Sequence, residues 1–157
     1  MSIELYNNTN GININLRDFS TESPDLPSIK YLYFSADFQT TEAGKTNKTE
    51  YGIQIAGTGV LKEPKDEQKT EDFVWSFMSS QFQGNPYMFN GLFKQEYLFD
   101  IEKYSALNNL TISYVNEDNF IIDNVKLATG YAADSAPSSM KTGKIVLYER
   151  DARIKYP

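Results

Sequence analysis

Apolar and polar residues alternate along most of the chain, and the spacing of an amphipathic helix is rare. In residues 32–38, the large apolar residues Leu32, Phe34 and Phe38 all lie at even-numbered positions. In a strand these positions share one face, which is expected to be buried. The apolar face of residues 73–77, which carries Trp75, is expected in the core for the same reason. About eight such stretches occur, at residues 12–16, 32–38, 51–55, 73–77, 97–101, 110–114, 120–127 and 145–148.

Turn-forming residues separate these stretches, for example Ser23-Pro24, Gly84-Asn85-Pro86 and Thr142-Gly143. Short strands separated by turns indicate an all-β sandwich or barrel of about eight antiparallel strands. Nothing divides the sequence, so residues 1–157 are expected to form a single domain. One or two helical turns are expected between Asp100 and Asn108. Two polar segments, residues 40–49 and 62–70, are expected to be mobile loops.

The composition removes several classes of chemistry, because the chain contains no Cys and no His. Disulfides, Cys nucleophiles, Ser-His-Asp triads and His-ligated or Cys-ligated metals are therefore excluded. Paired carboxylates are the hydrolytic option that is left, but no motif marks a pair among the 21 Asp and Glu residues. The sequence therefore favours a protein that is not an enzyme.

The net charge of −6 also limits the partners of the chain. An acidic protein is repelled by phosphate groups, so neither nucleic acid nor an anionic membrane surface is expected as a partner. No stretch approaches the roughly 18 consecutive apolar residues of a membrane helix.

Asp123 is a candidate metal ligand because of its place in residues 120–127. Strict alternation puts Asp123 on one face with Ile121, Val125 and Leu127, and that face is expected to be the core. A buried carboxylate must be hydrogen-bonded, paired or bound to a cation. Two interpretations follow: Asp123 accepts backbone N–H bonds at the sandwich edge, or it binds a structural Ca²⁺ together with Glu4 and backbone carbonyls.

Aromatic side chains are the second candidate feature. Residues 84–93 place several rings in a loop bounded by glycines, and alternation turns Tyr33 away from the core. Exposed rings beside amide side chains suit a sugar, since the ring face packs on the apolar side of the saccharide and the amides bind its hydroxyls. The same rings are also suited to closing one end of the sandwich or to contacting another subunit. The candidate sugar-binding residues are Tyr33, Asn85, Tyr87, Phe89 and Gln95.

Four segments resemble a module of phage tail and baseplate-associated structural proteins. Residues 84–89 and 93–101 resemble its loop of the type N-P-Y-N-F followed by F-x-Q-E-x-x-F-D-I. Residues 110–114 resemble the strand after it, and residues 121–131 resemble a strand of the type I-x-x-N-V-x-L-x-x-G. This last element is also similar to the final strand of jelly-roll carbohydrate-binding modules, in which an Asp at the position of Asp123 helps to bind a structural Ca²⁺.

The resemblance implies a non-enzymatic structural or adhesion domain of a phage virion with a jelly-roll β-sandwich. Such a domain contacts other virion proteins and, in some cases, a host-surface polysaccharide. The alternative that it implies is a carbohydrate-binding module of a secreted or virion enzyme. A place in the virion also implies closed rotational symmetry, and hence a homo-oligomer.

Overall fold

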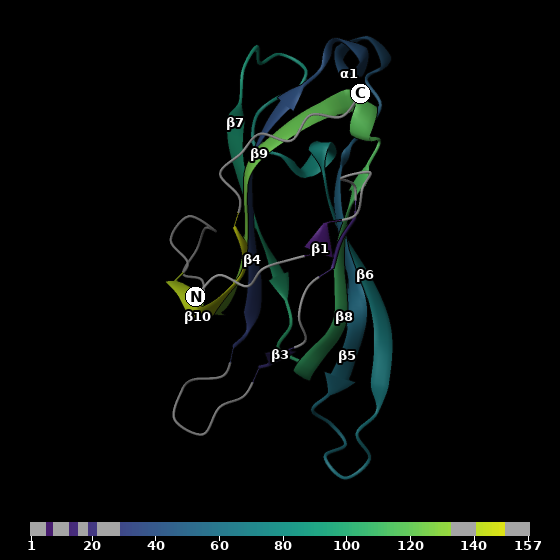
Figure 1. Cartoon of the computed structure of the whole chain (residues 1–157), viewed down its shortest axis with the longest axis vertical. Helices are drawn as coiled ribbons and strands as arrows, with labels where there is room; N and C mark the ends of the chain where they lie inside the picture. The colour runs from purple at the N-terminus through teal and green to yellow at the C-terminus, as the bar shows by residue number, and fades with distance from the viewer. Residues whose placement is uncertain (1–5, 8–12, 16–18, 22–28, 133–140, 150–157) are drawn as a thin grey trace.

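The computed structural model describes residues 6–7, 13–15, 19–21, 29–132 and 141–149. Strands dominate these residues, which confirms the predicted all-β class. Three short strands lie near the N-terminus, at Tyr6–Asn7 (β1), Asn13–Asn15 (β2) and Phe19–Ser20 (β3). The longer strands are β4 (Tyr31–Thr40), β5 (Gly52–Leu61), β6 (Thr70–Met78), β7 (Phe93–Asp100), β8 (Tyr104–Val115), β9 (Phe120–Ala132) and β10 (Lys141–Glu149) (Figure 1).

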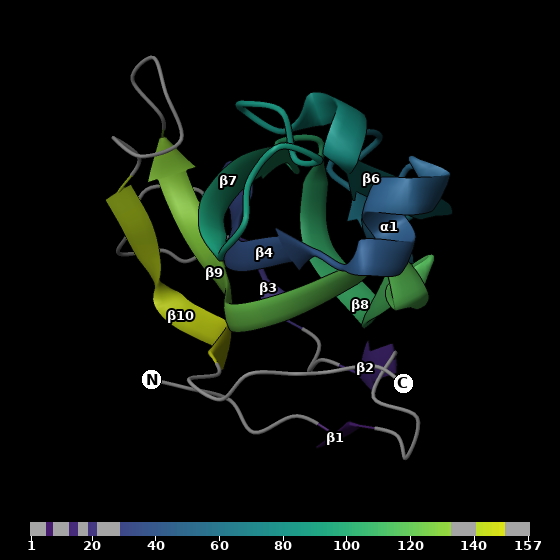
Figure 2. The same cartoon turned by 90° about the horizontal axis from the view of Figure 1, so that it is seen from above.

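The strands form two sheets whose pairings are antiparallel. One sheet has the order β1-β2-β8-β5-β6, with β3 also paired to β8, and the other has the order β10-β9-β4-β7. Seen from above, the two sheets are the walls of a sandwich (Figure 2). Each predicted stretch overlaps one of these strands, and β1 and β3 lie outside those stretches.

The core lies between the sheets and consists of the apolar residues that alternate along the strands. In β4, Leu32, Phe34 and Phe38 are fully buried, as the alternation predicts. In the facing sheet, Ile53 and Ile55 of β5 are fully buried too. Burial of these side chains is the main stabilising term of the fold, at about 1.5–3 kcal/mol for each large apolar residue.

β6 and β7 are the last strands of their sheets, and they face each other across the same side of the sandwich. Phe77 of β6 stacks on Tyr97 of β7 with 4.7 Å between ring centroids. Trp75 lies parallel to Phe99, with 5.7 Å between centroids. Trp75 therefore packs against the core as predicted, but it is half-buried because it lies at the open edge.

The helical turns lie elsewhere than the sequence predicts. The segment expected to contain them runs from the end of β7 through a short turn into β8, where the N–H of Tyr104 donates to the carbonyl of Ile101 over 3.0 Å. The helix α1 instead covers Glu42–Asn47, within a segment expected to be a loop. The Thr41 side chain caps its first turn, accepting from the N–H of Gly44 over 3.1 Å. The helix has only six residues and no apolar stripe, so the hydrophobic periodicity of the sequence could not predict it.

The predicted inward position of Asp123 is wrong, because β9 contains a β-bulge. Ser35 of β4 pairs with Lys126, whereas Asp37 pairs with Asp123, so β9 has one extra residue between the two pairs. Asn124 lies at this bulge and has a φ of 51°. The bulge reverses the alternation, so Ile122 before it and Val125 after it are both buried. Asp123 therefore shares the outer face of the sheet with Asp37 and is only half-buried.

Candidate functional site

The connection from β6 to β7 begins with the 3-10 helix η1 (Ser79–Gln81) and continues into residues 84–92, which we call the aromatic loop. The loop turns at Asn85, whose carbonyl accepts from the N–H of Met88 over 3.1 Å. The Asn85 side chain accepts from the N–H of Tyr87 over 3.0 Å, which fixes the same turn. Gly84 has a φ of 89°, and a Cβ added there would lie 3.1 Å from the Phe89 ring. A glycine is therefore required where the loop folds back on itself.

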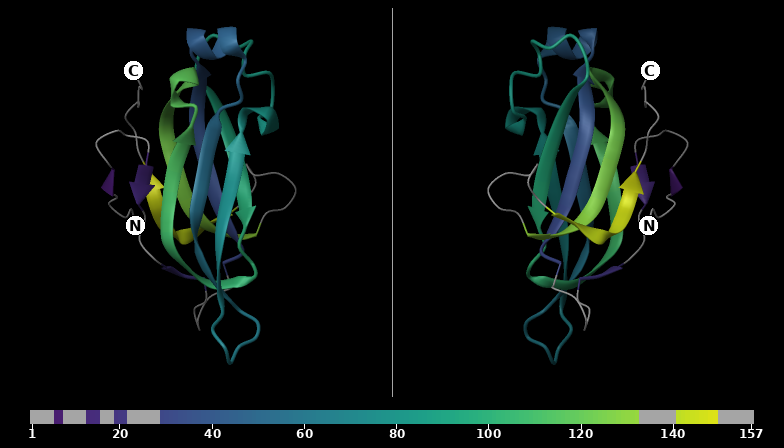
Figure 3. Two further views of the ribbon diagram at one scale, coloured as in Figure 1. Left: turned by 90° about the vertical axis from the view of Figure 1, so that its right-hand side faces the viewer. Right: turned by 90° about the vertical axis from the view of Figure 1, so that its left-hand side faces the viewer.

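A buried chain of hydroxyl groups anchors the aromatic loop to the core. The Thr40 hydroxyl donates to the carbonyl of Pro86 over 2.7 Å. Since that proton is used, the Tyr51 hydroxyl must donate to Thr40, over 2.7 Å. At the other end of the loop, Lys45 of α1 donates to the side chain of Asn90 over 2.8 Å. The loop and α1 thus form one end of the sandwich, opposite the β5–β6 connection (Figure 3).

The anchored loop presents apolar side chains to solvent. Met88 is 75% exposed and Phe89 is 45% exposed. Phe89 stacks on Phe93, the first residue of β7, with 5.1 Å between ring centroids. Large apolar side chains that are exposed together on a fixed loop are typical of a contact surface.

A groove of about 490 Å³ lies beside the aromatic loop. Asn85 and Tyr87 line it, together with Lys48 and Glu50 at the end of α1 and before β5. The Tyr87 hydroxyl donates to the carbonyl of Thr49 over 3.3 Å, which holds the ring at the side of the groove. The groove, which Phe82 also lines, thus combines two aromatic rings with an amide and two charged groups.

The structure brings together three of the five predicted sugar-binding residues, Asn85, Tyr87 and Phe89, and separates the other two from them. Gln95 is 6% exposed, and both ends of its amide bind the backbone of Gln83, over 2.9 and 3.1 Å. Tyr33 points away from the core as expected, but its ring is only 8% exposed, and this burial raises its pKa. The prediction that Tyr33 is an exposed stacking ring is therefore wrong, and Gln95 has a structural role.

The predicted calcium ligands are not brought together by the described structure. Glu4 lies outside the described residues, and the Asp123 carboxylate accepts from the N–H of Asn124 over 2.8 Å. Among the described residues, no three Asp or Glu side chains gather as a metal site would require. Calcium binding stays a prediction. It would be supported if added calcium raised the melting temperature of the wild type but not that of Asp123→Asn.

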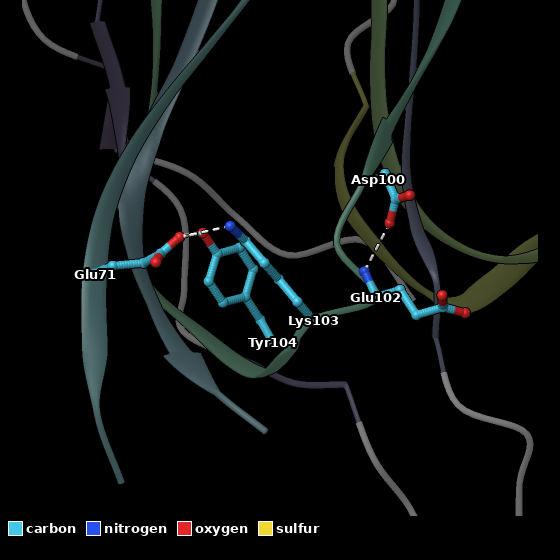
Figure 4. Close-up of polar contacts among 5 residues, drawn as sticks. All are labelled: Glu71, Asp100, Glu102, Lys103 and Tyr104. Carbon is cyan, nitrogen blue, oxygen red and sulfur yellow. Dashed lines mark hydrogen bonds and ion pairs between the residues drawn. The ribbon is translucent and has the colours of Figure 1, made fainter. Parts of the chain in front are cut away.

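A second polar cluster lies at the other end of the sandwich and comprises Glu71, Lys103 and Tyr104 (Figure 4). The Glu71 carboxylate accepts from the Tyr104 hydroxyl over 2.5 Å and lies 2.8 Å from the ammonium group of Lys103. Glu71 lies in β6, Lys103 in the β7–β8 turn and Tyr104 at the start of β8, so no local sequence motif predicts the cluster. Sequence reasoning missed the cluster for that reason.

The protonation states of this cluster argue against acid–base chemistry. The hydrogen bond from Lys103, followed by that from Tyr104, lowers the pKa of Glu71. The hydrogen bond to Glu71 raises the pKa of Lys103. Burial, and then the hydrogen bond to Glu71, raises the pKa of Tyr104 to about 12. Each shift moves a group further from neutral pH, so the cluster is a fixed ion pair rather than a proton donor and acceptor.

A second groove, of about 470 Å³, lies beside this cluster and is lined by Trp75, Asp100, Glu102 and Lys103. Asp100 accepts from the N–H of Glu102 over 2.9 Å and thereby orders the turn (Figure 4). The Trp75 ring stacks on Phe73 with 3.9 Å between centroids and lies parallel to Phe99. Rings of the protein itself take up the faces of Trp75, which disfavours this groove as a stacking site for a sugar.

Comparison of the chain with protein-family models, with curated proteins and with solved structures finds no match. Within the described part of the chain, no helix is long and apolar enough to cross a membrane.

Proposed function

We propose that this chain is a non-enzymatic structural and adhesion domain of a phage virion, which contacts other virion proteins through the aromatic loop. The observation that carries the proposal is the exposure of Met88 and Phe89 on a loop fixed by the Thr40–Pro86 hydrogen bond. A preordered apolar loop loses little conformational entropy when a partner covers it. Many copies in one particle would convert modest affinity into avidity.

The resemblance of residues 84–101 to the tail and baseplate module supports the place in the virion, since it covers the aromatic loop and β7. The strand order supports a jelly-roll topology. β4 pairs with β9 and β5 pairs with β8, so strands before β6 and β7 pair with strands after them. This nested pairing is what results when a long β-hairpin folds over on itself, as in a jelly roll.

Incorporation into particles tests the proposal. The tagged chain is expressed in the host that produces the phage, and particles purified on a density gradient are analysed by mass spectrometry. We expect the wild type in the particles and Met88→Ser/Phe89→Ser outside them. Lys65→Ser/Asp66→Ser changes two exposed residues in the connection at the opposite end and should be incorporated. Purified particles that lack the wild-type chain would overturn the proposal.

A carbohydrate-binding module is the second candidate, favoured by the groove that Asn85 and Tyr87 line. Its test is retention of host wall polysaccharide by the immobilised chain. Binding by the wild type that is lost in Tyr87→Ala, and kept in Lys65→Ser/Asp66→Ser, would establish this function. No retention by the wild type would leave protein contacts as the function of the loop.

A further inference from the structure

Within the part of the chain that the structure describes, β6 is an edge strand whose outward backbone groups have no partner. The hydrogen bonds at its two ends show which groups these are. The N–H of Leu61 donates to the carbonyl of Lys69 over 2.8 Å, and the N–H of Ser79 donates to that of Tyr51 over 2.6 Å. Both bonds continue the β5–β6 register, in which bonded and non-bonded pairs alternate. Odd-numbered residues of β6 therefore bond to β5. The backbone N–H and C=O groups of Asp72, Val74 and Ser76 point away from the sheet.

Apart from Glu71 and Asp72 at one end of β6, this edge lacks the usual protection against another strand. The pairing of β5 with β6 has no register shift, so no bulge twists the edge away. β6 contains no Pro, Lys or Arg, and Val74 at its centre is 63% exposed. Figure 1 shows β6 along the outer margin of its sheet.

β7, the edge strand of the facing sheet, is different. The N–H of Ile101 donates to the carbonyl of Lys30 over 2.9 Å, in register with the β4–β7 pairing. By the same alternation, the outward backbone groups of β7 belong to Lys94, Glu96, Leu98 and Asp100. Three of these four residues are charged, which is how natural proteins protect an edge.

We propose that β6 pairs antiparallel with β6 of a second copy of this chain, about a two-fold axis at Val74. The pairing joins Val74 to Val74 of the second copy, and Asp72 to Ser76. The Met78 N–H is already used, because it donates to the Gln81 side chain over 2.9 Å. Thr70, which also points outward, would face Met78 of the second copy, so the region in which every group can bond runs from Asp72 to Ser76 and is symmetric about Val74.

This symmetry favours a second copy over an unrelated strand. An isologous interface needs a surface that complements itself, and here donors meet acceptors on both sides of the axis. No like charges lie opposite each other, since Asp72 meets Ser76. The two Val74 side chains meet on one face of the joined sheet, as apolar cross-strand pairs do. The pairing does not depend on the aromatic loop, which lies at the end of the sandwich.

The test is the oligomeric state of the purified chain, measured by sedimentation velocity over a wide concentration range. We expect the wild type to be a dimer. Val74→Glu places two carboxylates at the axis and should give a folded monomer, with circular dichroism unchanged. Lys94→Gln is the matched control, since it makes the same change in net charge on the β7 edge, and it should stay dimeric.

A cysteine variant tests the register, because the chain has no cysteine of its own. Bonded antiparallel partners have Cα atoms about 5.5 Å apart, which a disulfide can span. Val74→Cys should therefore form a crosslinked dimer in air much faster than Lys94→Cys. A monomeric wild type, a dimer that Val74→Glu leaves intact, or equal crosslinking of the two variants would overturn the proposal.

Discussion

At the scale of single residues, Thr40 connects the core to the proposed contact surface. Its hydroxyl accepts from Tyr51 and donates to Pro86, and the side chain is buried. A buried hydroxyl that serves both partners cannot be replaced by an isosteric apolar group without leaving polar atoms unbonded.

Thr40→Val keeps the shape of the side chain but removes both hydrogen bonds. We expect the free energy of unfolding to fall by about 1–3 kcal/mol, because the Pro86 carbonyl and the Tyr51 hydroxyl lose their partner. Urea denaturation measures the change. Thr49→Val alters an exposed threonine nearby and should leave the midpoint almost unchanged. Equal midpoints for the two variants would contradict the anchoring role.

Among the tyrosines whose pKa is raised, Tyr51 and Tyr104 make the stability most sensitive to alkaline pH. Burial raises the pKa of Tyr51 and, with the hydrogen bond to Glu71, that of Tyr104, each from 10.0 to about 12. Between these values the unfolded chain has lost phenolic protons that the folded chain keeps, so the unfolded state binds fewer protons. Stability from these groups is therefore complete below pH 10 and is lost as the pH rises towards 12.

The expected result is a urea midpoint that is level up to pH 10 and falls steeply above it. Tyr51→Phe lowers the midpoint at neutral pH but makes the alkaline fall shallower, because one shifted group has been removed. Spectroscopic titration of the tyrosines follows the same ionisation directly. An alkaline slope that is identical in the variant and the wild type would show that Tyr51 ionises normally.

At the scale of secondary structure, the fit of β5 against β8 depends on Gly59. A Cβ added at Gly59 would overlap the ring of Tyr104, which is almost fully buried. The close approach lets the ring lie flat on the strand, with its hydroxyl directed at Glu71. The sheet thus needs glycine here for space rather than for an unusual backbone conformation.

Gly59→Ala should lower the free energy of unfolding by about 1–3 kcal/mol, since the Tyr104 ring must move out of its buried position. Gly91→Ala is the control, because no atom lies within 4 Å of a Cβ added there. Urea denaturation of the two variants should give a clear loss for the first and almost none for the second. A loss of similar size in both would point to backbone effects and not to the Tyr104 ring.

The edge strands show how two elements of similar length acquire different roles. β6 and β7 both end their sheets, but only β7 has charged residues at most of its outward positions. β6 has its acidic residues at one end and an exposed valine at its centre. The proposed pairing follows from this contrast between the two edges.

At the scale of the whole molecule, the net charge of −6 opposes association of two copies. The proposed β6 interface contains backbone hydrogen bonds and apolar contacts, which salt screens little. Added salt screens the overall repulsion, with a Debye length of about 10 Å at 0.1 M. We therefore expect the dimer to tighten as sodium chloride is raised, measured by sedimentation equilibrium. Weakening with salt would indicate attraction between charged groups and a different interface.

The local pattern determined the parts of this structure that depend on two-residue alternation. The buried faces of β4 and β5 follow directly from it, because side chains of a strand point to opposite faces in turn. The absence of His and Cys likewise limited the chemistry before any fold was known. Asn85, Tyr87 and Phe89 are adjacent in sequence, so their proximity was also predictable.

Long-range pairing decided the rest. Only the register between β4 and β9 reveals the bulge at Asn124, which turns Asp123 outward. The burial of Tyr33 and the meeting of Glu71 with Lys103 depend on contacts between segments that are distant in sequence. Which strand edge lacks a partner is a property of sheet order and not of any one strand. Two-residue alternation determines which face a side chain lies on only as long as no β-bulge adds a residue to the strand. It also carries no information about which residues of the next strand lie beside it.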